Sequence, residues 1–145
     1  MQIAMGWFLL VSGGVLYLAQ IISSVNFQLA QKLGIQENPE DTDELVQTSE
    51  RYTAYWDLLT LVWLPLSGAL MITNHAWWPV MSLFGSAIYL DTAGREAAKN
   101  LSFRHEGLKA GTIKQQKVFF ASYIVMALIA LLVIAYSIAS LSKLI

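Results

Sequence analysis

Long apolar stretches, separated by two polar connections, dominate this chain. A helix needs about 20 apolar residues to cross the hydrocarbon core of a membrane. Stretches of about that length run over residues 3–29, 52–73, 76–93 and 118–141. The pattern therefore predicts an all-α polytopic membrane protein, with residues 1–145 forming a single domain that is a four-helix transmembrane bundle.

Local signals place the boundaries of the second predicted helix. Pro39 interrupts helix in the first polar connection, and Asp41 followed by Glu44 fits a capping box with Asp in the capping position. A helix is expected to start there and to continue into the span 52–73. Pro65 is expected to kink it, because proline removes a backbone donor inside a helix.

The second half of the chain has similar signals. Pro79 lies where a first-turn proline is tolerated, and the polar residues after Ala93 are able to continue the third helix. Residues 101–111 are predicted to form a basic loop. Thr112 is expected to cap the fourth helix.

Composition supports a lipid environment. Charged residues make up 13% of the chain, against about 25% in a typical soluble domain. The net charge of −1 gives no overall attraction to nucleic acid, and no nucleic-acid partner is expected. The chain has no cysteine, which excludes thiolate chemistry, and no metal site is predicted.

The positive charges predict the orientation. Eight of the nine Lys and Arg residues lie in or beside the two long connections: Lys32, Arg51, Arg95, Lys99, Arg104, Lys109, Lys114 and Lys117. By the positive-inside rule, these connections face the cytoplasm and both termini lie outside. A bacterial inner membrane is the expected location. The basic loop is either a topology signal, a contact for anionic lipid head groups, or a surface that docks on the acidic first connection.

Asp57 is the strongest single candidate for a functional residue. It lies inside the second predicted span, where a lone charge costs roughly 2.5–3.5 kcal/mol unless it is paired or hydrated. Two interpretations stay open. Asp57 either pairs with a basic residue and fixes the helix register, or it takes part in ligand or ion binding.

Other charged residues are expected near the same cytoplasmic face. Asp91 and Arg95 are four residues apart and are able to form a helical ion pair. Glu50 and Asp57 are seven apart and share a helix face. The candidate ligand-binding set is therefore Glu50, Arg51, Asp57, Asp91 and Arg95, with Gln20 of the first span as an interhelical hydrogen-bond partner or a ligand contact.

The layout resembles the membrane-associated eicosanoid and glutathione metabolism family, whose members have four spans and a long first cytoplasmic connection. The resemblance rests on Glu50-Arg51 at the entry to the second span, Asp57, Pro65, and Tyr89 with Arg95 at the end of the third. It implies a trimer and glutathione as a cofactor, with Arg51 and Arg95 binding the carboxylates of that peptide. No cofactor is evident from the residues themselves.

Three functions remain open at this stage. The first is a non-enzymatic oligomeric or accessory component that contacts membrane lipids, further copies or other membrane subunits and has a polar ligand- or lipid-binding site at the cytoplasmic face. The second is a glutathione-dependent or lipid-modifying membrane enzyme. The third is a proton- or cation-coupled carrier or channel that uses Asp57. The sequence does not decide whether the chain is an enzyme.

Overall fold

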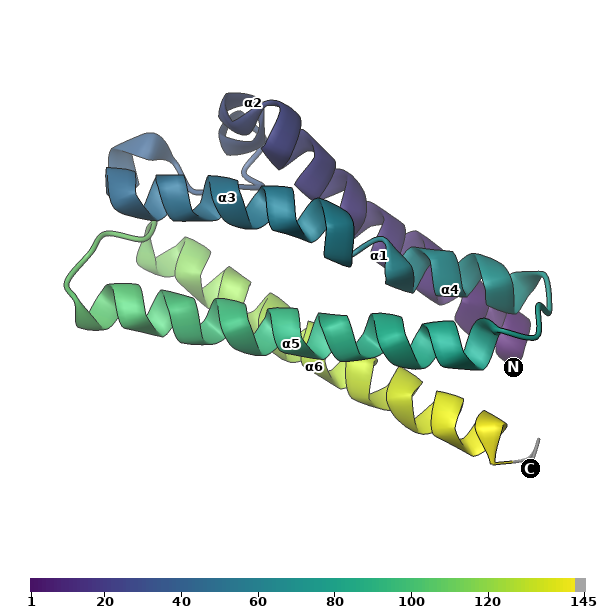
Figure 1. The fold of residues 1–145 in the computed structure, drawn as a ribbon. Coiled ribbons are helices and arrows are strands. Elements are labelled where there is room, and N and C mark those ends of the chain that lie inside the picture. The colour runs from purple at the N-terminus through teal and green to yellow at the C-terminus, as the bar shows by residue number, and fades with distance from the viewer. Residues whose placement is uncertain (143–145) are drawn as a thin grey trace.

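The computed structural model describes residues 1–142, and these residues are all-α. Three segments are long and apolar enough to cross a membrane: Gln2–Val25, Glu44–Ile72 and Ile113–Leu141. Figure 1 shows the long helices running side by side, with the N-terminus and the end of the last helix at one end of the bundle. The two long connections lie together at the opposite end.

The first apolar stretch forms two helices rather than one. Helix α1 (Gln2–Val25) ends at Asn26, whose side chain accepts a hydrogen bond from the backbone N–H of Leu29 and so caps α2 (Phe27–Lys32). The predicted span 3–29 is therefore too long at its C-terminal end. An asparagine favours this change of direction because its side chain satisfies a free backbone donor at the new helix start.

The second predicted span is also divided. A short 3₁₀ turn (Pro39–Asp41) leads to α3 (Glu44–Thr60), and α4 (Trp63–Ile72) follows after a break. Pro65 lies just after that break, and it has no N–H to donate to the carbonyl four residues earlier. The predicted kink is thus a full interruption. Asp41 is not the capping residue, because Asp43 occupies the N-cap position.

The third predicted span is the first part of α5 (Trp78–His105), which has Pro79 in its first turn as expected. The helix continues well past Ala93, so the polar continuation is helical and residues 101–105 do not belong to a loop. Helix α5 is not among the three segments that are apolar enough to span a membrane. Helix α6 (Ile113–Leu141) begins with a capping box between Thr112 and Gln115, which confirms the predicted cap.

Glycines allow close helix packing at the end of the bundle where α4 meets α5. A Cβ atom on Gly68 would lie 2.6 Å from the carbonyl oxygen of Gly6, and one on Gly85 would lie 2.9 Å from the backbone nitrogen of Leu64. Backbones therefore touch between α1 and α4 and between α4 and α5. The core packs beside these contacts: Leu9, Leu61, Leu64, Met71, Trp78, Tyr89, Ala130 and Val133.

The two long connections bind each other at the other end. The backbone N–H of Asp43 donates to the carbonyl of Lys109 at 2.9 Å, and an Asp43 carboxylate oxygen accepts from the Lys109 N–H at 2.8 Å. Thr42 and Ala110 form an antiparallel bridge. Of the three interpretations of the basic segment, these contacts agree with docking on the acidic connection, and they are made by backbone groups and the Asp43 carboxylate.

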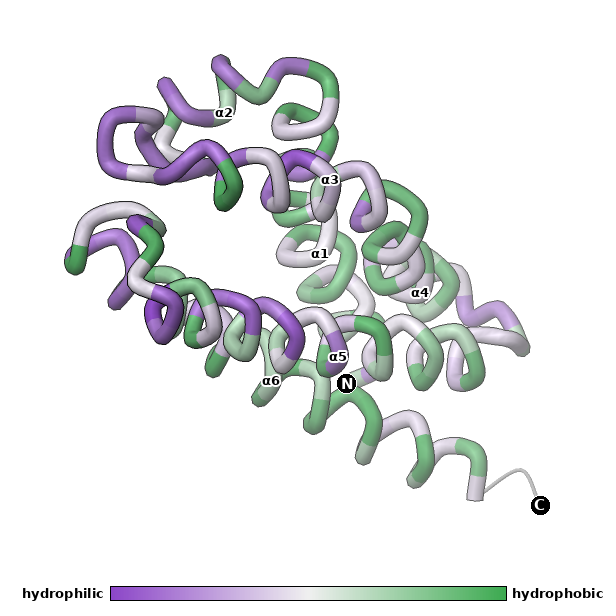
Figure 2. Tube along the Cα trace, turned by 60° about the vertical axis from the view of Figure 1, so that its left-hand side comes forward, coloured by the Kyte–Doolittle hydropathy of each residue, from purple (hydrophilic) through white to green (hydrophobic). Residues whose placement is uncertain are grey.

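The surface is apolar over most of the bundle. Large hydrophobic side chains on α6 are more than half exposed, including Ile124, Leu128 and Leu132. Figure 2 shows the hydrophilic segments concentrated around α2, the start of α3 and the connection between α5 and α6. This distribution suits a helical protein inserted in a membrane, with its polar end at the interface.

Candidate functional site

A cavity of about 330 Å³ lies toward the polar end of the bundle. Residues of α1, α3, α5 and α6 line it, together with residues 35–37 of the first connection. Its walls are mixed on the α1 and α6 sides, where Leu16 and Met126 lie beside Gln20 and Tyr123, and they carry the carboxylates on the α3 and α5 sides. The volume lies within the range of small-molecule pockets.

Four carboxyl groups line this cavity: Glu37, Glu50, Asp57 and Glu96. Each residue is more than nine-tenths buried, with exposed fractions of 5, 8, 1 and 7%. Buried carboxylates are costly unless they are paired, because the protein interior solvates charge poorly. The structure supplies two cations beside the cavity.

Lys99 of α5 is the first of these cations. Its ammonium group lies 3.0 Å from a Glu50 oxygen and also pairs with Glu96, three residues earlier on its own helix. It donates a further hydrogen bond to the Thr53 hydroxyl at 3.2 Å. Through its contacts with Glu50 and Thr53, Lys99 links α5 to α3.

Arg95 is the second cation. One guanidinium nitrogen lies 3.0 Å from Asp57, another lies 3.5 Å from Asp91, and Nε is 3.6 Å from Glu96. The predicted Asp91–Arg95 helical pair is thus confirmed, but the shorter contact is with Asp57 on the other helix. The interpretation that Asp57 pairs with a basic residue is also confirmed. This pairing does not exclude a binding role, because Asp57 lines the cavity as well.

Two polar groups in the cavity wall have no hydrogen-bond partner in the described part of the chain. The Thr92 hydroxyl is buried without a hydrogen bond, and Oε1 of Glu96 has only the 3.6 Å contact with Arg95. Glu37 makes no ion pair among residues 1–142. Burial raises the pKa of Glu37, and the neighbouring charge of Glu96 adds to the rise. A backbone hydrogen bond and the charge of Lys99 oppose it, but the pKa stays above its ordinary value. The cavity therefore presents acceptors that a bound ligand is able to satisfy.

The sequence-based candidates separate into three groups. Gln20, Glu50 and Asp57 line the cavity, whereas Arg95 and Asp91 lie beside it in the ion-pair network. Arg51 is exposed on α3 and does not line the cavity. The binding of a carboxylate by Arg51 and Arg95 together stays a prediction.

Sequence reasoning missed several members of the site: Glu37, Thr92, Glu96, Lys99 and Tyr123. A signal for three of them was available. Thr92, Glu96 and Lys99 follow one another at spacings of four and three, which places them on one face of a helix. The predicted third span ends at residue 93, so it contains Thr92 but not Glu96 or Lys99. Glu37 has no such signal, because its position depends on how the connection folds.

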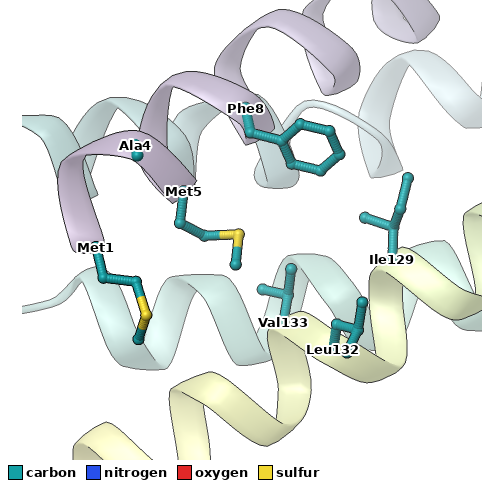
Figure 3. Close-up of a pocket in the computed structure, with 7 residues that line it drawn as sticks. All are labelled: Met1, Ala4, Met5, Phe8, Ile129, Leu132 and Val133. Atoms are coloured by element: carbon teal, nitrogen blue, oxygen red, sulfur yellow. The ribbon is translucent and has the colours of Figure 1, made fainter.

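A second cavity, of about 350 Å³, lies between α1 and α6 nearer the N-terminus. Figure 3 shows Met5 and Phe8 of α1 facing Ile129 and Val133 of α6 across it. Met1, Ala4 and Leu132 complete its lining, which is entirely apolar in residue type. We call this space the α1–α6 groove.

The fold and the site together define a class: a small helical protein with apolar helices of membrane-spanning length and a charged cavity between them. No family model, curated protein or solved structure matches this chain. The resemblance to the eicosanoid and glutathione metabolism family, and the glutathione and trimer that it implies, stay predictions.

Proposed function

We propose that this chain is an integral membrane protein that reversibly binds a small cationic ligand in the cavity between α1, α3, α5 and α6. Binding needs no catalytic step, so the chain acts as a non-enzymatic component in contact with lipids and with further copies or other membrane subunits. Helix α5 is the remaining span beside the three apolar segments. The long connections face the cytoplasm, which places the cavity near that membrane face.

The sign of the lining charge carries this proposal. Four carboxyl groups line the cavity, and no Lys or Arg within residues 1–142 does. Lys99 pairs with two of them and Arg95 with a third, which leaves Glu37 without an ion pair in the described residues. A cationic group beside Glu37 would give this carboxylate an ion-pair partner. The same group would be able to donate hydrogen bonds to the Thr92 hydroxyl oxygen and to Oε1 of Glu96, which accept none from residues 1–142.

Ligand binding to the purified protein tests this proposal. Methylammonium and guanidinium chloride are titrated into the protein in lipid nanodiscs, and binding is followed by calorimetry and by thermal shift. We expect saturable binding with a rise in melting temperature, since a ligand at 100 times its dissociation constant adds about 2.7 kcal/mol to the stability. Potassium chloride at equal ionic strength is the control for screening.

A pair of variants locates the site. Glu37→Gln removes the unpaired carboxylate, whereas Glu40→Gln makes the same change at an exposed position of the same connection. The first variant is expected to weaken binding at least tenfold and the second to leave it unchanged. Equal affinities in the two variants, or no saturable binding of either cation, would contradict the proposal.

A carrier of protons or cations is the second candidate, and the burial of Asp57 in the cavity wall favours it. In that case, liposomes that contain the protein show an ion- or pH-dependent flux that Asp57→Asn abolishes. The Asp91→Asn variant keeps the flux, because Asp91 does not line the cavity. Binding without flux above that of empty vesicles leaves the first proposal alone.

A further inference from the structure

The charged cavity and the α1–α6 groove share the same two helices. On α1, the groove is lined by Ala4, Met5 and Phe8, and the cavity by Leu16, Ala19 and Gln20. Steps of three, four or eight residues separate these positions, which keeps them on one side of the helix. Phe8 and Leu16 are eight residues apart, or about 12 Å along the axis. The two spaces therefore follow one another along a common seam.

Helix α6 continues the same seam. Val118, Ser122 and Met126 line the cavity, and Ile129 and Val133 line the groove, at steps of four, four, three and four. Helix α6 packs mainly on α5, and α1 packs on α3 and α4, so close packing does not seal the seam between α1 and α6. Polarity changes along it, from buried carboxylates at one end to apolar side chains only at the other.

Building on the proposed function, we infer that the ligand is an amphiphile with one alkyl chain, whose cationic head lies in the charged cavity and whose tail lies in the α1–α6 groove. The unpaired Glu37 and the partnerless Thr92 hydroxyl, both more than nine-tenths buried, give the head its binding groups. The lining of Met5, Phe8 and Val133 gives the tail an apolar surface.

The size of the groove favours a chain over a helix from a second copy. A helix is about 10 Å across, so about 350 Å³ would hold less than one turn of it. A flexible alkyl tail fills such a volume without moving α1 from α6. A helix from a second copy would also need a basic side chain long enough to reach the buried Glu37. The head of a small ammonium ligand has no such constraint.

Chain length and head charge are varied to test the inference. Methylammonium, hexadecylammonium and hexadecanoate are titrated into the protein in phosphatidylcholine nanodiscs, with free aqueous concentrations measured and empty nanodiscs as the blank. The long alkyl chain is needed because Phe8 and Gln20 are twelve residues apart on α1, or about 18 Å along the axis. Each methylene that leaves water strengthens binding about fourfold at most. Hexadecylammonium is therefore expected to bind at least a hundredfold tighter than methylammonium. Hexadecanoate has a similar tail with the opposite charge, and it is expected not to bind.

A variant of the groove distinguishes binding of the tail in the groove from partitioning of the tail into the surrounding lipid. Ala4→Phe fills the groove, whereas Val11→Phe places the same ring on an exposed position of α1 that lies outside both cavities. Ala4→Phe is expected to reduce the advantage of hexadecylammonium at least tenfold and to leave methylammonium binding unchanged. Val11→Phe should change neither. Methylammonium binding in Ala4→Phe shows that the charged cavity, and therefore the fold, is intact. A weaker effect of the alkyl tail is then due to the filled groove.

Two results would overturn the inference while the cation site stands: equal affinity for methylammonium and hexadecylammonium, or a hexadecylammonium advantage that Ala4→Phe leaves intact. Tight binding of hexadecanoate would overturn the choice of a cationic head. Failure of both ammonium probes to bind would contradict the proposed function and the inference together.

Discussion

Lys99 pairs with two buried carboxylates, those of Glu50 and Glu96, at shorter distances than Arg95 reaches Glu96. Its side chain is 17% exposed, and those of Glu50 and Glu96 are 10 and 9% exposed. Removing one partner from a buried ion pair costs about 3–5 kcal/mol, because the other charge stays buried without compensation. Lys99→Met should therefore lower the unfolding free energy by about that amount, as measured by chemical denaturation in detergent.

Two further variants identify the cause of that loss. Lys117→Met removes a lysine from an exposed position on α6 and should change the unfolding free energy by less than about 0.5 kcal/mol. Adding Glu50→Gln and Glu96→Gln to Lys99→Met should recover much of the stability, since the uncompensated charges are then gone. No recovery in the triple variant would show that lost packing, not charge, explains the defect.

The two aspartates that pair with Arg95 allow a matched comparison. The Asp57 side chain is 2% exposed at 3.0 Å from Arg95, whereas Asp91 is 72% exposed at 3.5 Å. Exposed pairs contribute about 0–1 kcal/mol, because water screens and replaces them. Asp57→Asn should destabilise by about 1–3 kcal/mol, as expected for a buried charged hydrogen bond. Asp91→Asn should cost less than about 1 kcal/mol, and thermal melts that rank the two variants in the opposite order would refute this assignment.

Glu37 makes stability depend on pH. Burial raises its pKa above the ordinary value of 4.5, with Lys99 opposing and Glu96 adding to the rise. The folded chain then holds this proton more tightly than the unfolded chain. Its contribution to stability is full below pH 4.5 and is lost as pH rises through the raised pKa of the folded state.

The neutral variant Glu37→Gln removes this dependence. The melting temperature of the variant minus that of the wild type should therefore become more positive as pH increases from about 4 to about 8. Glu40→Gln, at an exposed position, should give a difference that is flat over the same range. A Glu37→Gln difference that falls with rising pH would show that Glu37 is stabilised as a carboxylate instead.

At the scale of the helices, close contact between α1 and α4 depends on glycine. A Cβ atom on Gly68 would lie 2.6 Å from two backbone atoms, the Gly6 oxygen and the Leu10 nitrogen, and neither is able to move without its helix. Gly68→Ala should destabilise the fold by about 1–3 kcal/mol despite the better helix propensity of alanine. Gly14→Ala meets no atom within 4 Å and should be neutral or stabilise by up to about 1 kcal/mol in the same unfolding assay.

The sequence predicted that these segments are helices better than it predicted the residues at which each helix begins and ends. The long apolar stretches and the capping box of Thr112 are local patterns, and the helices follow them. The division at residues 61–62 was harder to place, because Pro65 shows that a helix is disturbed but not how far the chain turns. Asp43 replaced Asp41 as the N-cap because it also binds Lys109, a contact 66 residues away in sequence.

The candidate site was predicted to a similar degree. Asp57 and Glu50 were found because an acid in or beside an apolar helix is costly and therefore informative. Glu96 and Lys99 lay in a segment that reads as a polar helix end, where charges are usual. Only the ion pairs from α3 to α5 show that this end is buried, and pairing between helices is not a local property of the sequence.

The two ends of the whole bundle are built differently. Backbones touch through glycine at the end that carries the N-terminus, whereas α3 and α5 diverge at the other end and ion pairs join them across the space. Tight packing resists movement, and a space bridged by long charged side chains is able to admit a ligand. The cavity therefore lies where the helix pairs separate, and the position of that end relative to the membrane decides which compartment supplies the ligand.

That position is open to a direct test, because the chain contains no cysteine. A single cysteine at Ala76, in the exposed turn between α4 and α5, should react with a membrane-impermeant maleimide added to intact cells. One at Glu106, in the exposed connection between α5 and α6, should react only after the membrane is permeabilised, because eight of the nine basic residues gather at that end. The cysteine-free chain reports background labelling. The reverse pattern would place the charged cavity at the outer face, and equal labelling of both sites in intact cells would contradict α5 as a membrane span.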